Sequence, residues 1–155
     1  MIDLLTIEVI ENDRGGHDDL LLAIPELLGS KTFDTYYFCL AIEPKATTDD
    51  IRNAVAQLLQ FWLDKIEEMK NEEIVYLPID FSDQYTGCLK VLKKATQLIL
   101  NYGFSRREGW AVNPLNPNNF YKEINDFQSE TEKQLAVDKA NFIFYLDKQI
   151  QKLKK

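Results

Sequence analysis

The sequence predicts an α+β fold, in which a mainly antiparallel sheet packs against two long helices at about 47–70 and 129–153. Strand-like alternation is clustered along the chain rather than interleaved with helices, which argues against a parallel βαβ sheet. Two other stretches repeat apolar residues at steps of three and four, as amphipathic helices do. With 155 residues, 45% of them hydrophobic, the chain has the material for one core, and we expect a single domain, 1–155.

The N-terminal part is predicted to contain two strands with a short helix between them. Residues 2–10 alternate loosely and lead into a polar, glycine-rich loop, which is typical of a strand and its turn. Residues 20–28 are apolar but contain Pro25, and they predict a short helix or two helical turns. Residues 35–42 are dense in aromatic and β-favouring side chains, so we expect a buried strand there.

The best-defined element is the helix 47–70. Thr47 and Asp50 have the spacing of a capping box, in which each side chain binds the backbone amide of the other residue. Leu58 and Trp62 lie on its apolar stripe and are expected to be buried. The full stripe contains Ile51, Val55, Leu58, Trp62, Ile66 and Met69.

The following segments predict the sheet. Residues 74–81 read as a strand in which Pro78 favours an edge position or a bulge. Residues 85–104 fit either a hairpin, with strands at 85–92 and 96–105, or a single helix, and we favour the hairpin.

The C-terminal part is predicted to contain a loop, a strand and the second long helix. Residues 113–119 hold two prolines and four asparagines, which favour turns. Residues 120–127 are then expected to form a strand. Ser129 and Glu132 have the spacing of a capping box that would open the helix 129–153.

The net charge of −7 is distributed unevenly. Residues 1–83 carry 18 acidic and 6 basic side chains, and residues 84–155 carry 7 acidic and 12 basic ones, which gives −12 and +5. An acidic chain is a poor generic binder of nucleic acids or anionic membranes. Solvated helix faces and a lysine-rich tail explain such a split without a function, and the functional alternative is a negative face for a basic protein partner.

The sequence predicts a cytoplasmic protein. The first residues lack the basic and apolar regions of an export signal, and no apolar run approaches the ~20 residues of a membrane helix. Cys39 and Cys88 have no metal-binding spacing, and we expect both to be buried thiols in a reducing compartment.

Motifs for catalysis, cofactors and metals are weak. Asp80 and Asp83 have the spacing of an acid–base pair, but such a pair at a strand end is also an ordinary turn signature. His17 with Asp18 and Asp19 offers adjacent loop residues, which rarely supply a complete set of metal ligands. No serine or glycine-rich nucleotide motif is present. We therefore expect no catalytic residue, no metal and no cofactor.

Paired arginines beside a tryptophan mark a candidate interface. Arg106 and Arg107 precede Trp110, and Tyr85 comes from the neighbouring strand of the favoured hairpin. Arginine, tryptophan and tyrosine are the residues that most often anchor protein interfaces. The alternative is that Trp110 packs in the core and the arginines pair with acidic side chains.

Two stretches, 77–87 (LPIDFSDQYTG) and 102–110 (YGFSRREGW), resemble small bacterial immunity proteins of toxin–immunity systems, including contact-dependent growth inhibition. They cover about 20 of the 155 residues. The resemblance implies a monomeric or weakly dimeric inhibitor that binds one cognate toxin domain and occludes its active site without catalysis.

The sequence thus favours a non-enzymatic protein that neutralises a toxin, with a basic nuclease as the expected target. One alternative is a small hydrolase that uses Asp80 and Asp83, and another is a scaffold subunit of a larger complex. The residues expected to contact the partner are Asp18, Asp19, Asp80, Asp83, Tyr85, Arg106, Arg107 and Trp110.

Overall fold

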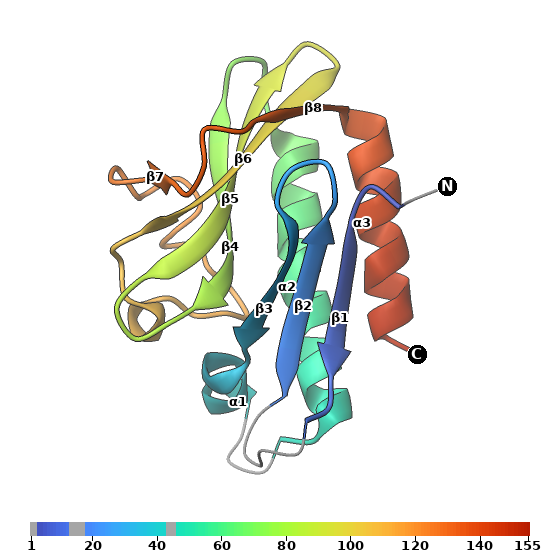
Figure 1. Ribbon diagram of the computed structural model, residues 1–155, viewed down its shortest axis with the longest axis vertical. Helices are drawn as coiled ribbons and strands as arrows, with labels where there is room; N and C mark the ends of the chain where they lie inside the picture. Colours follow the sequence, from blue (N-terminus) through green and yellow to red (C-terminus); the bar gives the residue numbers. More distant parts are fainter. Residues whose placement is uncertain (1–2, 13–17, 43–45) are drawn as a thin grey trace.

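The computed structural model describes residues 3–12, 18–42 and 46–155 (Figure 1). In these ranges the strands form two antiparallel sheets, one of three strands and one of five, accompanied by three α-helices. The predicted α+β fold class is confirmed. His17 and the glycine-rich part of the first loop lie outside the described residues.

The first sheet has the order β1-β2-β3, and it confirms the strand predicted at 2–10. Its strands are β1 (Thr6–Ile10), β2 (Asp19–Ile24) and β3 (Gly29–Asp34).

Strand β2 and the turn after it replace the short helix predicted at 20–28, and that prediction is wrong. Leu20, Leu22 and Ile24 are fully buried, and the residues between them are only half-buried. Burial therefore alternates every second residue, as it does in a strand. A continuous apolar run conceals this alternation. Pro25 opens the following turn instead of interrupting a helix.

Helix α1 (Tyr36–Ile42) replaces the strand predicted at 35–42, which is also wrong. The Asp34 carboxylate accepts a hydrogen bond from the Tyr36 amide at 2.7 Å, which satisfies a donor at the start of the helix. One face of the helix buries Phe38 completely. Capping and this burial outweigh the β propensity of the aromatic residues.

Helix α2 (Thr48–Glu68) confirms the helix predicted at 47–70. Both hydrogen bonds of the capping box are present, from the Asp50 amide to the Thr47 hydroxyl at 3.1 Å and from the Thr47 amide to the Asp50 carboxylate at 2.9 Å. Leu58 and Trp62 are fully buried, as predicted. The Trp62 indole also donates to the carbonyl of Pro78 at 3.0 Å, which ties the helix to the second sheet.

The second sheet begins with three strands that follow one another in sequence and in space. These are β4 (Ile74–Phe81), β5 (Thr86–Lys94) and β6 (Gln97–Ser105). A continuous ladder joins β5 to β6, so the hairpin prediction for 85–104 is confirmed and the helix alternative is wrong. Strand β4 lies at the edge, and its register shifts between Pro78 and Asp80, as the proline indicated.

The C-terminal helix is shorter than predicted, because α3 spans Lys139–Leu153 and does not begin at 129. The expected cap, Ser129, lies in β7 (Gln128–Ser129), where its hydroxyl donates to the Asn101 amide oxygen at 2.7 Å. Asp138 caps α3 instead, by accepting from the Ala140 amide at 2.8 Å.

The segment before α3 is used to complete the second sheet. Strand β8 (Leu135–Asp138) pairs with β6, and this pairing excludes a helix there. The strand predicted at 120–127 is wrong, because this segment consists of turns and irregular backbone. It bends over the open edge of β4, where the Tyr121 carbonyl accepts a hydrogen bond from the Tyr76 amide at 2.8 Å.

Helix α2 lies behind the first sheet in Figure 1 and contacts β1, β4 and α3, so both sheets share its buried side chains. Strand β3 lies beside β4 without hydrogen-bonded pairing. None of the helices in the described ranges has the length and apolar character that spanning a bilayer requires. Cys39 and Cys88 form no disulfide; Cys88 is buried as predicted, whereas Cys39 is only half-buried.

Candidate functional site

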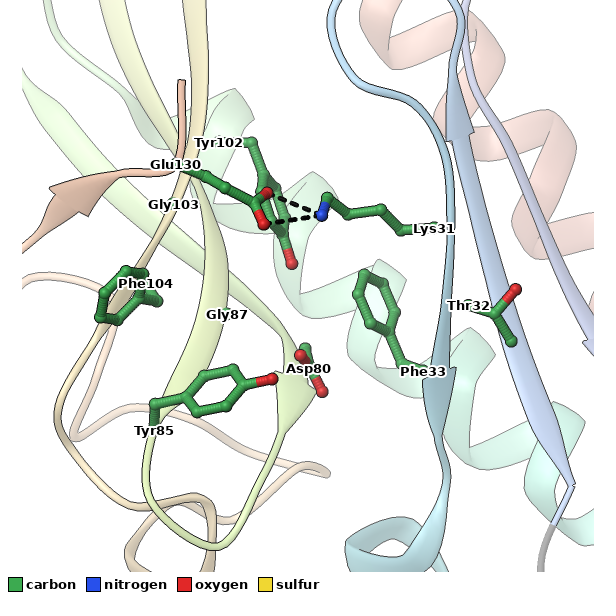
Figure 2. A pocket seen from close by; sticks show the side chains of 10 residues that line it. All are labelled: Lys31, Thr32, Phe33, Asp80, Tyr85, Gly87, Tyr102, Gly103, Phe104 and Glu130. Carbon is green, nitrogen blue, oxygen red and sulfur yellow. Dashed lines mark hydrogen bonds and ion pairs between the residues drawn. The ribbon is translucent and has the colours of Figure 1, made fainter. Parts of the chain in front are cut away.

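A cleft of about 530 Å³ lies where β3 faces β4, β5 and β6 (Figure 2). Aromatic rings from both sides line it: Phe33 on β3 faces Tyr102 and Phe104 of β6 and Tyr85 of the turn between β4 and β5. Its charged side chains come from three separate segments. They are Lys31, Asp80 and Glu130.

An ion pair spans one part of the cleft. The Lys31 ammonium lies 2.7 Å from the Glu130 carboxylate, and these residues come from opposite sides of the cleft. The same ammonium lies 5.6 Å from the centroid of the Tyr102 ring, which is a cation–π distance. Tyr102 stacks on Phe33 with ring centroids 6.4 Å apart, so this part of the cleft is packed and electrostatically paired.

Asp80 occupies the other part of the cleft and is only 8% exposed. Ser82 donates a hydrogen bond to its carboxylate at 3.0 Å, and the Tyr85 hydroxyl points toward it in Figure 2. Burial raises the pKa of Asp80 above its ordinary value, and the hydrogen bonds with Ser82 and Tyr85 offset only part of that rise.

The backbone around Asp80 explains how these groups come together. The register shift in β4 places Asp80 opposite Gly87 of β5. A Cβ atom on Gly87 would lie 2.6 Å from the Tyr102 hydroxyl oxygen and 2.8 Å from the Asp80 Cβ. The glycine therefore lets Asp80 and the Tyr102 hydroxyl both lie close to the backbone of β5. Burial, and then the charge of Asp80, raise the pKa of Tyr102 well above its ordinary value.

Next to the cleft lies the aromatic patch, formed by the exposed Tyr36 and Leu40 and the half-buried Tyr37 of α1 and by the exposed Trp110. Tyr36 is 44% exposed, Leu40 61% and Trp110 65%. Trp110 belongs to a short 3₁₀ helix, η1 (Gly109–Ala111). A hollow of about 300 Å³ lies between α1 and η1, with Leu40 and Trp110 on its walls.

Three carboxylates each accept a hydrogen bond from a residue of the aromatic patch, and we refer to them as the rim acids. They are Asp34, Asp83 and Glu108. Asp34 binds the Tyr36 amide at 2.7 Å, Asp83 accepts from the Tyr37 hydroxyl at 2.5 Å, and Glu108 accepts from the Trp110 indole at 2.7 Å. The hydrogen bond with Asp83 is the main cause that raises the pKa of Tyr37 to about 12. The patch is therefore apolar at its centre and negative at its border.

The turn between β4 and β5 connects the patch to the cleft. Its backbone is closed by a hydrogen bond from the Ser82 amide to the Tyr85 carbonyl at 3.0 Å. The Gly109 amide of η1 donates to the Ser82 carbonyl at 2.7 Å. Tyr85 thus faces the cleft and Asp83 the patch, so the two features form one continuous site.

The structure brings together half of the predicted contact residues. Asp80 and Tyr85 line the cleft, and Asp83 and Trp110 belong to the patch or its border. Trp110 does not pack in the core, which contradicts the alternative reading of that residue.

The other four lie apart from these features or are engaged elsewhere. Asp18 is buried, and its carbonyl accepts from the Thr35 hydroxyl at 2.7 Å. Asp19 is half-buried in β2. The exposed Arg106 donates from its amide to Asp126 at 2.9 Å, and the guanidinium of Arg107 donates to the Asn119 carbonyl.

Several site residues were missed by the sequence reasoning. Lys31, Phe33 and Glu130 carry no local motif, because the cleft depends on the packing of the two sheets. The strand predicted at 35–42 places Tyr36 and Leu40 in the core, whereas both are exposed on α1. The one available signal was Gly87, since an isolated glycine within a strand indicates a close approach of another group.

The two carboxylates named in the hydrolase alternative lie in different parts of the site. Asp80 binds Ser82 within the cleft and Asp83 binds Tyr37 at the patch, so the two carboxylates have separate partners. Among the described residues, no group of three or more His, Cys, Asp or Glu side chains is placed to hold a metal ion.

Replacing Asp80 with asparagine is expected to leave the protein at least as stable at pH 7. The folded pKa of Asp80 is raised, so the ionised form costs stability at neutral pH, and that cost disappears as the pH falls through the folded value toward the ordinary one. The advantage of Asp80→Asn should therefore be largest at pH 7 and shrink by pH 4. Urea unfolding of both proteins at several pH values measures it, and an advantage that grows toward low pH would contradict the assignment.

In comparisons with known proteins, no family model, curated protein or solved structure matches this chain.

Proposed function

We propose that this protein is a non-enzymatic immunity protein, which binds a basic toxin domain and occludes its active site. The observation that carries the proposal is the aromatic patch with its rim acids. Exposed tryptophan, tyrosine and leucine side chains grouped on one face are typical of surfaces that bind other proteins.

The border of the patch favours a basic partner. Asp34, Asp83 and Glu108 are exposed and each accepts a hydrogen bond from a residue of the patch, so their carboxylates would face lysine or arginine side chains of a bound protein. Complementary charge steers encounter and disfavours acidic partners. The apolar centre supplies the area that is removed from water on binding.

A nuclease is the toxin class that this surface suits. An enzyme that cleaves nucleic acid binds phosphates through lysine and arginine side chains. The rim acids offer such a groove negative groups in place of phosphates, while Trp110 and Leu40 fill space beside them. The segments 77–87 and 102–110, which resemble immunity proteins, supply Asp83, Glu108 and Trp110 to this surface.

Growth protection tests the proposal. The product of an open reading frame next to the gene is expressed in bacteria with and without this protein. We expect arrest without it and growth with it, and we expect Leu40→Asp to lose protection because a charge is placed in the centre of the patch. Phe144→Asp is the matched control, since Phe144 is 63% exposed but lies on α3, on the side of the molecule away from α1 (Figure 1).

Two outcomes would contradict the proposal. One is that no neighbouring product arrests growth in a way that this protein relieves. The other is that Leu40→Asp and Phe144→Asp protect equally well while both remain folded by circular dichroism.

Reversing a rim charge is expected to slow association with the purified toxin domain. Glu108→Lys and Asp147→Lys change the net charge by the same amount, but Glu108 borders the patch and Asp147 is exposed on α3. We expect roughly a tenfold lower association rate for Glu108→Lys at low salt and a much smaller change for Asp147→Lys, with the difference shrinking as salt screens exposed charges. Stopped-flow association at several salt concentrations measures both, and equal rates would place the interface elsewhere.

A further inference from the structure

The charges of the cleft are not balanced. Lys31 and Glu130 neutralise each other at 2.7 Å, which leaves Asp80 as one surplus carboxylate. The ion pairs found among the described residues all involve other carboxylates. Asp80 therefore forms none of these ion pairs, and the one cation of the cleft that acts on it, Lys31, is already paired with Glu130.

Such a carboxylate is costly at the depth where Asp80 lies. It is only 8% exposed, and burying an ionised carboxylate is unfavourable unless a cation and hydrogen bonds compensate it. Ser82 and Tyr85 satisfy part of its acceptor capacity, but a carboxylate has roughly four acceptor positions. A cation that entered the cleft would remove the remaining cost.

The walls of the cleft suit a cation as well. Phe33 and Tyr85 approach Asp80 from opposite sides in Figure 2, and Tyr85 is held edge-on against Phe104 with ring centroids 6.0 Å apart. Aromatic faces attract ammonium and guanidinium groups through their quadrupoles. The cleft already accommodates one cation in this way, because Lys31 lies over Tyr102.

The size and openness of the cleft indicate what kind of cation it takes. A volume of about 530 Å³ exceeds what an inorganic ion needs and lies within the range of about 300–1,000 Å³ that small organic ligands occupy. Two carboxylates disfavour an anionic ligand. Because the cleft adjoins the aromatic patch through the turn at Ser82, a protein bound to the patch could extend a side chain into it.

We propose that the cleft binds an arginine or lysine side chain of the partner, with the Asp80 carboxylate as its counter-ion and the rings of Phe33 and Tyr85 beside it. This inference rests on the proposed function, because the bound toxin domain supplies the side chain.

The first experiment needs no toxin. The isotope-labelled full chain is titrated with N-acetyl-arginine methylamide, and amide signals are followed by NMR at pH 7. The neutral isostere N-acetyl-citrulline methylamide serves as the control ligand, because it keeps the shape of arginine without its charge. We expect the arginine probe to shift the signals of Asp80, Gly87 and Phe104 with a millimolar dissociation constant, on the order of −4 kcal/mol.

The variants assign the binding to Asp80. We expect at least tenfold weaker binding of the arginine probe to Asp80→Asn and no change in Asp147→Asn, whose carboxylate is exposed on α3. Citrulline should bind at least tenfold more weakly than arginine to the unaltered protein. Equal binding of the two probes, shifts that do not gather at the cleft, or an unaltered response in Asp80→Asn would each overturn the proposal.

The second experiment separates this inference from the proposed function. Asp80→Asn should bind the toxin domain at least tenfold more weakly, whereas growth protection by the unaltered protein tests the function itself. If the unaltered protein protects and Asp80→Asn binds the toxin normally, the inference fails and the function stands. If no toxin is bound but the arginine probe binds through Asp80, the cation comes from a small molecule, and the partner side chain is excluded.

Discussion

Replacing Trp62 with alanine is expected to lower the free energy of unfolding by about 3–5 kcal/mol. Trp62 is fully buried on α2, in contact with the second sheet, so its removal loses apolar burial and leaves a cavity that the surrounding side chains fill only in part. The change also leaves the Pro78 carbonyl without the indole donor that lies 3.0 Å away. Both effects act at the point where α2 meets the edge strand β4.

Urea unfolding followed by far-ultraviolet circular dichroism measures this loss. Trp110→Ala is the matched control, because it removes the same side chain at a position that is 65% exposed, and its stability should change by less than about 1 kcal/mol. A loss below about 1 kcal/mol in Trp62→Ala would show that the apolar stripe of α2 does not carry the core.

Trp110→Ala is expected to change binding strongly, although it changes stability little. Trp110→Ala should weaken the complex with the toxin domain by about 2 kcal/mol or more, which is about 30-fold in the dissociation constant. The side chain stands between a hollow of about 300 Å³ and solvent, and its indole is oriented by the hydrogen bond to Glu108 at 2.7 Å. A large, oriented and exposed aromatic ring has little conformational freedom to lose on binding.

Dissociation kinetics distinguish a direct contact of Trp110 with the toxin domain from a loss of electrostatic steering or of the folded structure. The dissociation rate should rise in Trp110→Ala while the association rate changes by less than about threefold, because most interface substitutions act on dissociation. Phe144→Ala also removes an exposed aromatic ring, but from α3 instead of η1, and it should leave both rates unchanged. Unaltered dissociation in Trp110→Ala would remove the patch from the interface.

The elements that could be predicted from the sequence are those with complete local signals. Helix α2 has a cap and an apolar stripe that agree, and both capping hydrogen bonds form. In the β5–β6 hairpin, the alternation through 96–105 predicts a strand rather than a helix, and the observed ladder is continuous.

The elements that could not be predicted depend on contacts between distant segments. Ser129 has the local pattern of a helix cap, but it is used in the second sheet, where its hydroxyl binds Asn101. The apolar run that forms β2 is buried enough to hide its alternation, and the aromatic residues of α1 form a helix that their propensity disfavours. Tertiary packing decided each of these cases.

The candidate site likewise contains residues that could be predicted from the sequence and residues that could not. Asp80, Asp83, Tyr85 and Trp110 belong to two short stretches that the sequence already singled out, and the β4–β5 turn and η1 bring them together. Lys31, Phe33 and Glu130 could not have been selected, because their role comes from the approach of β3 to the second sheet.

The ion pair between Lys31 and Glu130 has a consequence for folding. Its partners are 99 residues apart in the chain, and Phe33 also stacks on Tyr102 from a distant part of the sequence. Closing so long a loop costs conformational entropy that only the docked sheets recover, so contacts of this kind form late compared with a local hairpin such as β5–β6. The cleft is thus absent from any partly folded chain that has only one of the sheets, and a protein that binds through it recognises the fully folded molecule.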